Sequence, residues 1–149
     1  MAENDETELR AIVQHLENAW NAGDARAWVR DYHRDCLLIN MLGNPLIGIE
    51  ENERRHASVF SGIFAGSRIT MTVDRIGTLT GENVAVVDTT LRLSGYKALP
   101  PNISPTDPGG RILVMIMRHI IERGEAGWRI RFSQNQAVPP PPATGAQPS

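Results

Sequence analysis

The first third of the chain carries apolar residues at helical spacing. Between Glu6 and Asn21 they fall at i, i+3, i+4, i+7 and i+11, which predicts an amphipathic helix with one buried face. These residues are Leu9, Ile12, Val13, Leu16 and Trp20. Asp5 has the chemistry of an N-cap residue for this helix, and Gly23 is a natural stop. A second, shorter helix is predicted from Ala25 to Tyr32, capped by Asp24.

The segment Asp35–Phe64 contains most of the polar residues that are expected to face the interior. A short strand over Cys36–Met41 is predicted to turn at Gly43–Pro45 into a second short strand that ends at Gly48, and a helix follows to about Phe64. One face of this helix combines apolar side chains with an asparagine and a histidine at helical spacing: Ile49, Asn52, His56, Val59, Phe60 and Ile63. The pattern therefore places a histidine on the buried face.

The second half of the chain changes to the alternating pattern of β-strands. Four strands are predicted, over residues 68–79, 83–96, 111–123 and 128–136. Both faces of Ile112–Met117 are apolar, which indicates a central strand that is covered on both sides. The connection Gly95–Gly110 contains four prolines and three glycines. A loop of this length in a small domain is usually functional or mobile.

Helices that precede a run of strands predict an α+β fold. Residues 1–138 are expected to form a single domain, and the proline-rich tail 139–149 is predicted to be disordered. A curved antiparallel sheet wrapped over three helices leaves a hollow between them. Because ligand sites form in such concavities, the order of elements predicts a pocket.

Composition narrows the functional classes. The net charge of −2 argues against a nucleic-acid-binding protein, which usually presents a basic face. No apolar run approaches the roughly 20 residues that a membrane span needs. The polar, acidic N-terminus is unlike a signal peptide, so a cytoplasmic location is expected. Cys36 is the only cysteine and the four histidines are scattered, so no metal site is expected.

Several stretches together resemble the nuclear transport factor 2-like superfamily, which includes ketosteroid isomerases, scytalone dehydratase and SnoaL-like polyketide cyclases. They are AWNAGD at Ala19–Asp24, the run D-x-L-x-I-N-x-x-G at Asp35–Gly43, and Gly48. Three further stretches are similar to the SgcJ/EcaC group of that superfamily: INMLG at Ile39–Gly43, H-x-x-x-F at His56–Phe60, and W-R-I…Q-N at Trp128–Asn135. The resemblance covers about residues 6–138 and implies a cone-shaped fold around a pocket.

The resemblance also implies a role in enediyne polyketide (antibiotic) biosynthesis, with an apolar polyketide or polyene intermediate bound in the pocket. Two hypotheses stay open. The protein is an acid–base cyclase, dehydratase or isomerase, or it is a non-catalytic binding protein that shields the product or assists the polyketide synthase. No glycine-rich dinucleotide fingerprint follows a strand, so no cofactor is expected. Sheets of this superfamily commonly pair through their outer faces, which predicts a homodimer.

Three polar residues are the candidates for chemistry. His56 is a possible general acid or base, or a core histidine bonded to a neighbouring group. The resemblance places Asn40 where ketosteroid isomerases keep a catalytic carboxylate, and an amide there orients a ligand or supports the turn at Gly43. His119 matches the region of the isomerase oxyanion hole. A one-residue slip in register would instead point Arg118 inward.

The remaining candidates are expected to line the pocket. Trp28, Tyr32, Phe60, Met115 and Met117 would form walls, although core packing explains each of them as well. Strict alternation along the last strand puts Phe132, Gln134 and Gln136 on one face. Phe132 would then be a wall and Gln134 a polar contact with the ligand, while Ser133 and Asn135 take the other face.

Overall fold

The computed structural model describes residues 1–142 of the chain, and it forms three helices and six strands. In chain order they are α1 (Glu3–Ala22), α2 (Ala25–Trp28), β1 (Tyr32–Ile39), β2 (Pro45–Ile47), α3 (Ile49–Ser61), β3 (Arg68–Thr78), β4 (Val84–Ser94), β5 (Leu113–Gly124) and β6 (Gly127–Ala137). The α+β fold predicted from the order of elements is confirmed. All four long strands lie where the alternating pattern placed them, within two residues at each end.

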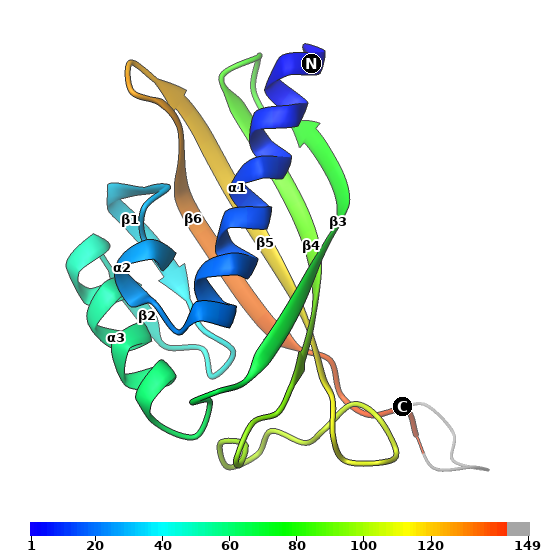
Figure 1. Cartoon of the computed structure of the whole chain (residues 1–149). Helices are drawn as coiled ribbons and strands as arrows, with labels where there is room; N and C mark the ends of the chain where they lie inside the picture. Colours follow the sequence, from blue (N-terminus) through cyan, green and yellow to red (C-terminus); the bar gives the residue numbers. More distant parts are fainter. Residues whose placement is uncertain (143–149) are drawn as a thin grey trace.

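One curved six-stranded sheet forms the body of the molecule, and the three helices lie against the same face of it (Figure 1). The strand order is β2-β1-β6-β5-β4-β3, with β3 at one edge and the short β2 at the other. Every neighbouring pair is antiparallel except β1 and β6, which run parallel. The predicted antiparallel sheet is therefore mixed at this one pair. The main core fills the space between helices and sheet.

Helix α1 is held to the edge of the sheet by its polar side chains. The Asn21 amide donates to the Ile69 carbonyl oxygen (3.0 Å) and accepts from the Ile69 N–H (2.7 Å). Glu17 accepts from the Met71 N–H at 2.8 Å. These bonds satisfy backbone groups of β3 that no further strand pairs with. Asp5 is not the N-cap, because the helix begins at Glu3; its carboxylate instead accepts from Arg123 of β5 (2.6 Å).

The second helix is shorter than predicted. Asp24 caps it as expected, since its side chain accepts from the Ala27 N–H at 3.0 Å, but the helix ends at Trp28. Tyr32 instead begins β1 and pairs with Ile130 of β6. The parallel pairing, which includes a bond from the Ile130 N–H to the Asp31 carbonyl oxygen, overrides the helical preference of this segment.

A β-bulge divides β6 into two halves whose side chains follow opposite alternation. Ile121 pairs with Ile130 and Ile120 with Phe132, so Arg131 is an extra residue with no partner of its own on β5. Trp128 and Ile130 are buried before the bulge, whereas Ser133 is buried after it and Gln134 is exposed. The predicted orientation of Phe132, Gln134 and Gln136 is wrong, because an inserted residue exchanges the two faces of a strand.

Strand β5 keeps strict alternation and lies in the middle of the sheet. Met115, Met117 and His119 are all buried on its inner face, so the register that would turn Arg118 inward does not occur. On the outer face Ile116 is 52% exposed in the single chain. The prediction that this strand is covered on both sides therefore holds only for the inner face, and the homodimer stays a prediction.

The C-terminal segment lies outside this packed body. Pro139–Pro142 continue from β6 as exposed chain without regular structure, and residues 143–149, most of the predicted disordered tail, lie outside the described residues.

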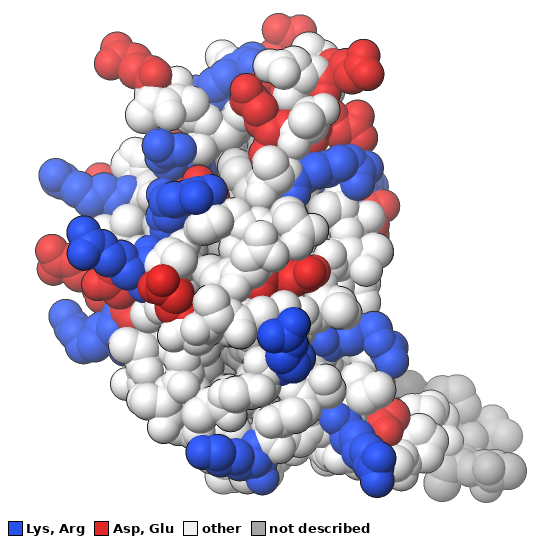
Figure 2. Space-filling view, in the orientation of Figure 1, with Lys and Arg blue, Asp and Glu red and all other residues white. Residues whose placement is uncertain are grey.

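Basic and acidic side chains are interspersed on the face of the molecule that Figure 2 shows. Within residues 1–142, none of the helices has the length and apolar character that crossing a membrane requires.

Replacing Asn21 by Ala should destabilise the protein. Two backbone groups of Ile69 lose their partners, and a loss of about 2 kcal/mol in the free energy of unfolding is expected. Asn18→Ala is the matched control, because the exposed Asn18 on the same helix bonds only Gln14 and the gain in helix propensity is the same. Urea unfolding of both variants measures the difference. Equal stabilities would show that the bonds to β3 contribute nothing.

Candidate functional site

A cavity of about 260 Å³ lies between α3, the end of α1, and the inner face of the sheet. The turn between β1 and β2, the segment after α3, and Pro100 of the long loop between β4 and β5 surround its mouth. The loop is fixed there by a bond from the Lys97 N–H to the Ile63 carbonyl oxygen (2.8 Å). Its lining is mostly apolar: Trp20, Trp28, Leu38, Met41, Leu42, Leu46, Val59, Ile63, Phe64, Ile69, Leu91, Pro100, Met115 and Met117.

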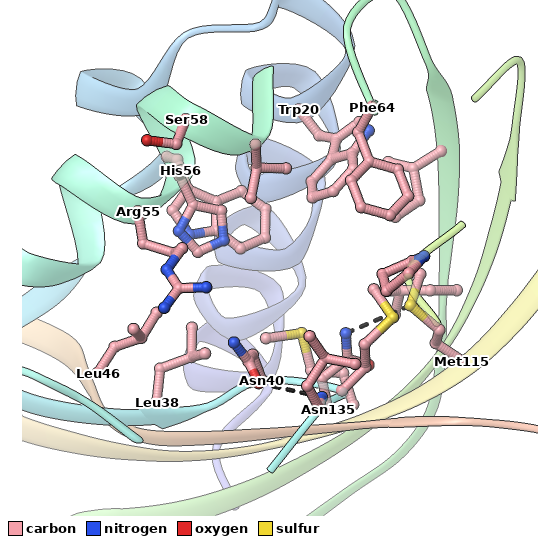
Figure 3. Close-up of a pocket in the computed structure, with 18 of the residues that line it drawn as sticks. Trp20, Leu38, Asn40, Leu46, Arg55, His56, Ser58, Phe64, Met115 and Asn135 are labelled. Carbon is pink, nitrogen blue, oxygen red and sulfur yellow. Dashed lines mark hydrogen bonds between the residues drawn. The ribbon is translucent and has the colours of Figure 1, made fainter. Parts of the chain in front are cut away.

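Five other residues complete the lining. Asn40, Arg55, His56, Ser58 and Asn135 come from the end of β1, from α3 and from β6. Figure 3 shows Arg55 and His56 together on α3, Asn40 below them next to Asn135 at the sheet, and Phe64 and Met115 on the opposite side of the cavity. The sequence predicted two of these residues, His56 and Asn40, and the structure brings both to the same space.

His56 is oriented by its own helix and by Trp28. Its Nδ1 lies 2.9 Å from the Asn52 carbonyl oxygen, which only accepts, so Nδ1 carries the proton. The ring stacks on Trp28 with centroids 4.7 Å apart. Nε2 has no hydrogen-bond partner among the described residues and is not fully covered by protein atoms. Its lone pair therefore faces the cavity as an acceptor.

Burial lowers the pKa of His56 from 6.5 to about 4, and nearby Arg55 acts in the same direction, while the bond to Asn52 opposes them. The imidazole is consequently neutral near pH 7. In this state it can accept a proton or a hydrogen bond at Nε2, but it holds no proton there to give. The bond at Nδ1 fits the interpretation as a hydrogen-bonded core histidine, and the acid–base role of Nε2 stays a prediction.

Asn40 both supports the turn and reaches the cavity. Its Oδ1 accepts from the backbone N–H groups of Leu42 and Asn44, each at 3.0 Å. Because those groups only donate, the oxygen is fixed on the turn side and the Nδ2 amino group is left to face the cavity (Figure 3). The Asn40 amino group is therefore available as a hydrogen-bond donor toward this space.

Asn135 is a lining residue that the sequence prediction assigned to the wrong face. The bulge at Arg131 turns it inward, where its Nδ2 donates to the Met115 Sδ at 3.3 Å. Its Oδ1 is buried without a partner among the described residues. Arg55 and Ser58 were also missed, since they flank the predicted inward stripe of α3 and only the position of the mouth brings them to the cavity.

His119 and Tyr32 belong to a separate buried cluster. The Ser133 hydroxyl lies 2.6 Å from His119 Nδ1 and 2.9 Å from the Tyr32 hydroxyl, and all three side chains are buried. Burial lowers the pKa of His119 to about 4 and raises the pKa of Tyr32 well above its usual value. Neither residue lines the cavity. Their predicted roles at the site have no geometric support in this chain.

The other predicted wall residues divide between the cavity and its surroundings. Trp28, Met115 and Met117 line the cavity as predicted. Phe60 does not line it and packs edge-on against the lining residue Trp20. Phe132 and Gln134 lie on the outer side of β6, where Gln134 borders a surface depression with Arg118. No group of three or more His, Cys, Asp or Glu side chains within residues 1–142 is arranged to hold a metal ion.

Solved structures show what fold this is. No protein-family model matches the chain, and no curated protein matches it. It is similar to a domain of unknown function with a cystatin-like fold from Nostoc punctiforme PCC 73102, at a TM-score of 0.78 and 20% identity over 93% of this chain and 80% of that one.

Two further structures extend the comparison. One is a ketosteroid isomerase-like protein from Erwinia carotovora atroseptica SCRI1043, with a TM-score of 0.68 and 16% identity over 88% of this chain and 94% of that one. The other is an NTF-2-like protein of unknown function from Shewanella oneidensis MR-1, with a TM-score of 0.67 and 18% identity over 91% and 99%. At these identities the likeness shows the fold, and it confirms the predicted cone-shaped, nuclear transport factor 2-like architecture.

The two buried histidines should make stability depend on pH. Each pKa is lowered from 6.5 to about 4 in the folded chain, so between these values the unfolded chain binds more protons than the folded one. The free energy of unfolding should fall by several kcal/mol as the pH drops from about 6.5 to about 4, since one pKa unit corresponds to about 1.4 kcal/mol. Urea unfolding across this range measures the fall.

Imidazole signals in NMR spectra test the same assignment directly. At least two of the four histidines should keep the chemical shifts of neutral rings down to about pH 5, because their charged forms are disfavoured by burial. If His56 or His119, identified by substitution, titrated near its ordinary pKa of 6.5 in the folded protein, the assignment would be wrong.

Proposed function

We propose that the protein binds a compact apolar small molecule that carries an oxygen function, and that His56 accepts a proton from it. The observation that carries this proposal is the cavity itself, in which an apolar lining surrounds the open Nε2 of His56 and the free amino group of Asn40. Pockets that combine apolar walls with a few converging polar groups are the usual form of small-molecule sites.

The resemblance to the SgcJ/EcaC group supports a polyketide-type ligand. An engineered cavity of about 150 Å³ holds benzene, so 260 Å³ corresponds to about two fused rings. An extended polyene is longer than this space, and its remaining part would leave through the mouth beside Leu42 and Pro100. A cyclised product, or the end of a chain that is about to cyclise, therefore fits better than a whole linear intermediate.

The chemistry available to this arrangement is removal of a proton next to a carbonyl group. Nε2 of His56 takes the proton from the carbon, and the electron pair moves onto the carbonyl oxygen to give an enolate, which the Asn40 amino group can stabilise as a donor. Return of the proton to another position isomerises the ligand, and attack by the enolate carbon on a second carbonyl closes a ring. Both outcomes are consistent with a cyclase or isomerase of polyketide biosynthesis.

The second candidate is a non-catalytic binding protein that shields a polyketide product or assists its synthase. Asn40 favours this candidate, because an amide stands where the resemblance places the isomerase carboxylate. The low pKa of His56 also makes its imidazole a weak base. The two candidates share the same ligand site and differ only in whether bonds change there.

Filling the cavity should abolish binding. Val59→Trp places a large ring in the lining, so an apolar two-ring probe such as 2-naphthol should no longer bind, while the unmodified protein binds one equivalent. Ala57→Trp is the matched control, because Ala57 lies on the exposed side of the same helix. Isothermal titration calorimetry measures both. If Val59→Trp bound the probe as well as the control variant, the ligand would not occupy this cavity.

Exchange of a carbon-bound proton distinguishes the two candidates. The protein in deuterated buffer should accelerate exchange at the carbon next to the carbonyl group of 2-tetralone, a two-ring ketone, as followed by NMR. His56→Gln should lose at least about tenfold of this acceleration, since the amide is not a base near neutral pH.

The same His56→Gln variant should still bind 2-naphthol, which separates the loss of a base from the loss of the site. Unchanged exchange rates in this variant would remove His56 from the chemistry. If the unmodified protein bound the ketone without accelerating exchange, the non-catalytic candidate would replace the catalytic one.

A further inference from the structure

The charged side chains that line the cavity have one sign. Arg55 is the only lysine, arginine, aspartate or glutamate among its lining residues, and His56 is neutral near pH 7. Four other surface depressions on the described part of the chain each include an acidic side chain, such as Glu17, Asp24 or Asp88. The cavity lining thus carries one positive charge and no acidic side chain, and Glu51, one helical turn before Arg55, accepts instead from the Ile47 N–H at 2.7 Å.

Arg55 is also free to bind a ligand. Its guanidinium group makes no salt bridge and no hydrogen bond with another side chain or backbone group in residues 1–142, although seven salt bridges occur elsewhere in that range. Figure 3 shows the guanidinium group directed from α3 toward Asn40. Two donors without acceptors, Arg55 and the Asn40 Nδ2, therefore border the same part of the cavity.

An apolar carboxylic acid matches this distribution. A carboxylate has only acceptor atoms, and arginine binds it in a planar, often bidentate geometry. Arg55 is solvent-exposed, whereas the lining residues Trp20, Trp28, Met115 and Met117 are buried. The acid group would therefore sit toward the mouth, and the rings would fill the interior. This orientation leaves the charge partly hydrated, which avoids the cost of burying it.

We propose that the ligand is a one- or two-ring apolar carboxylic acid, bound as its carboxylate by Arg55 and the Asn40 amino group. This inference rests on the proposed small-molecule function and adds the class of ligand. It makes Arg55 a residue that determines specificity rather than a solvated surface charge. It also predicts that a neutral analogue of the same size binds in the same cavity but more weakly.

The test compares 2-naphthoate with 2-naphthol, which have the same rings and differ in charge near pH 7. Isothermal titration calorimetry should give at least about tenfold tighter binding of 2-naphthoate, with a preference that shrinks at high salt. Arg55→Gln should weaken 2-naphthoate binding by about tenfold and leave 2-naphthol unchanged. Arg54→Gln, on the exposed adjacent position and outside the cavity lining, should alter neither.

Two further variants test whether the carboxylate binds at Asn40 and inside the cavity. Asn40→Asp keeps the acceptor that supports the turn, removes the donor and adds a negative charge, so it should weaken 2-naphthoate more than 2-naphthol. Val59→Trp should block both probes, which excludes binding of the anion to surface arginines.

The outcomes separate this inference from the function on which it rests. Equal binding of the two probes, or a preference for 2-naphthoate that survives Arg55→Gln, would overturn the carboxylate inference while the small-molecule site stands. If neither probe bound the unmodified protein, both the inference and the proposed function would be overturned.

Discussion

The inserted residue at Arg131 determines which side chains reach the interior from the last strand. Before the bulge, Trp128 and Ile130 pack in the core; after it, Ser133 and Asn135 face inward and Phe132 does not. Because side chains alternate with a period of two, one extra residue exchanges the faces for the rest of the strand. The cavity consequently receives an amide from β6, and the core beneath it receives a hydroxyl.

That hydroxyl allows two titratable side chains to be buried together. Ser133 bonds both His119 and Tyr32, so polar groups from three strands meet in an otherwise apolar core. Burial of polar groups is tolerated where such bonds are made, and it keeps both side chains uncharged near pH 7. This cluster lies beside the cavity without opening to it.

Two polar residues of the cavity, His56 and Asn40, share one feature: a backbone group binds one polar atom of the side chain, and the other polar atom is left without a protein partner. His56 Nδ1 donates to the Asn52 carbonyl oxygen, and Asn40 Oδ1 accepts from two backbone N–H groups of the turn after β1. These bonds fix a tautomer and an amide orientation that would otherwise be free. The site therefore presents a defined acceptor and a defined donor before any ligand arrives, and such preorganisation reduces the cost of binding.

The sequence determined the helices, the four long strands, the α+β class and the inward position of His56, because hydrophobic periodicity reflects local geometry. It also placed Asn40 near a pocket through family resemblance. Tertiary structure alone decided the end of α2, where strand pairing at Tyr32 prevailed, and the faces of β6, because no glycine or proline marks the bulge at Arg131. The position of Arg55 at the cavity was also decided by tertiary structure. The mouth of the cavity forms where separate helices, strands and loops come together, and the local sequence pattern does not predict where that happens.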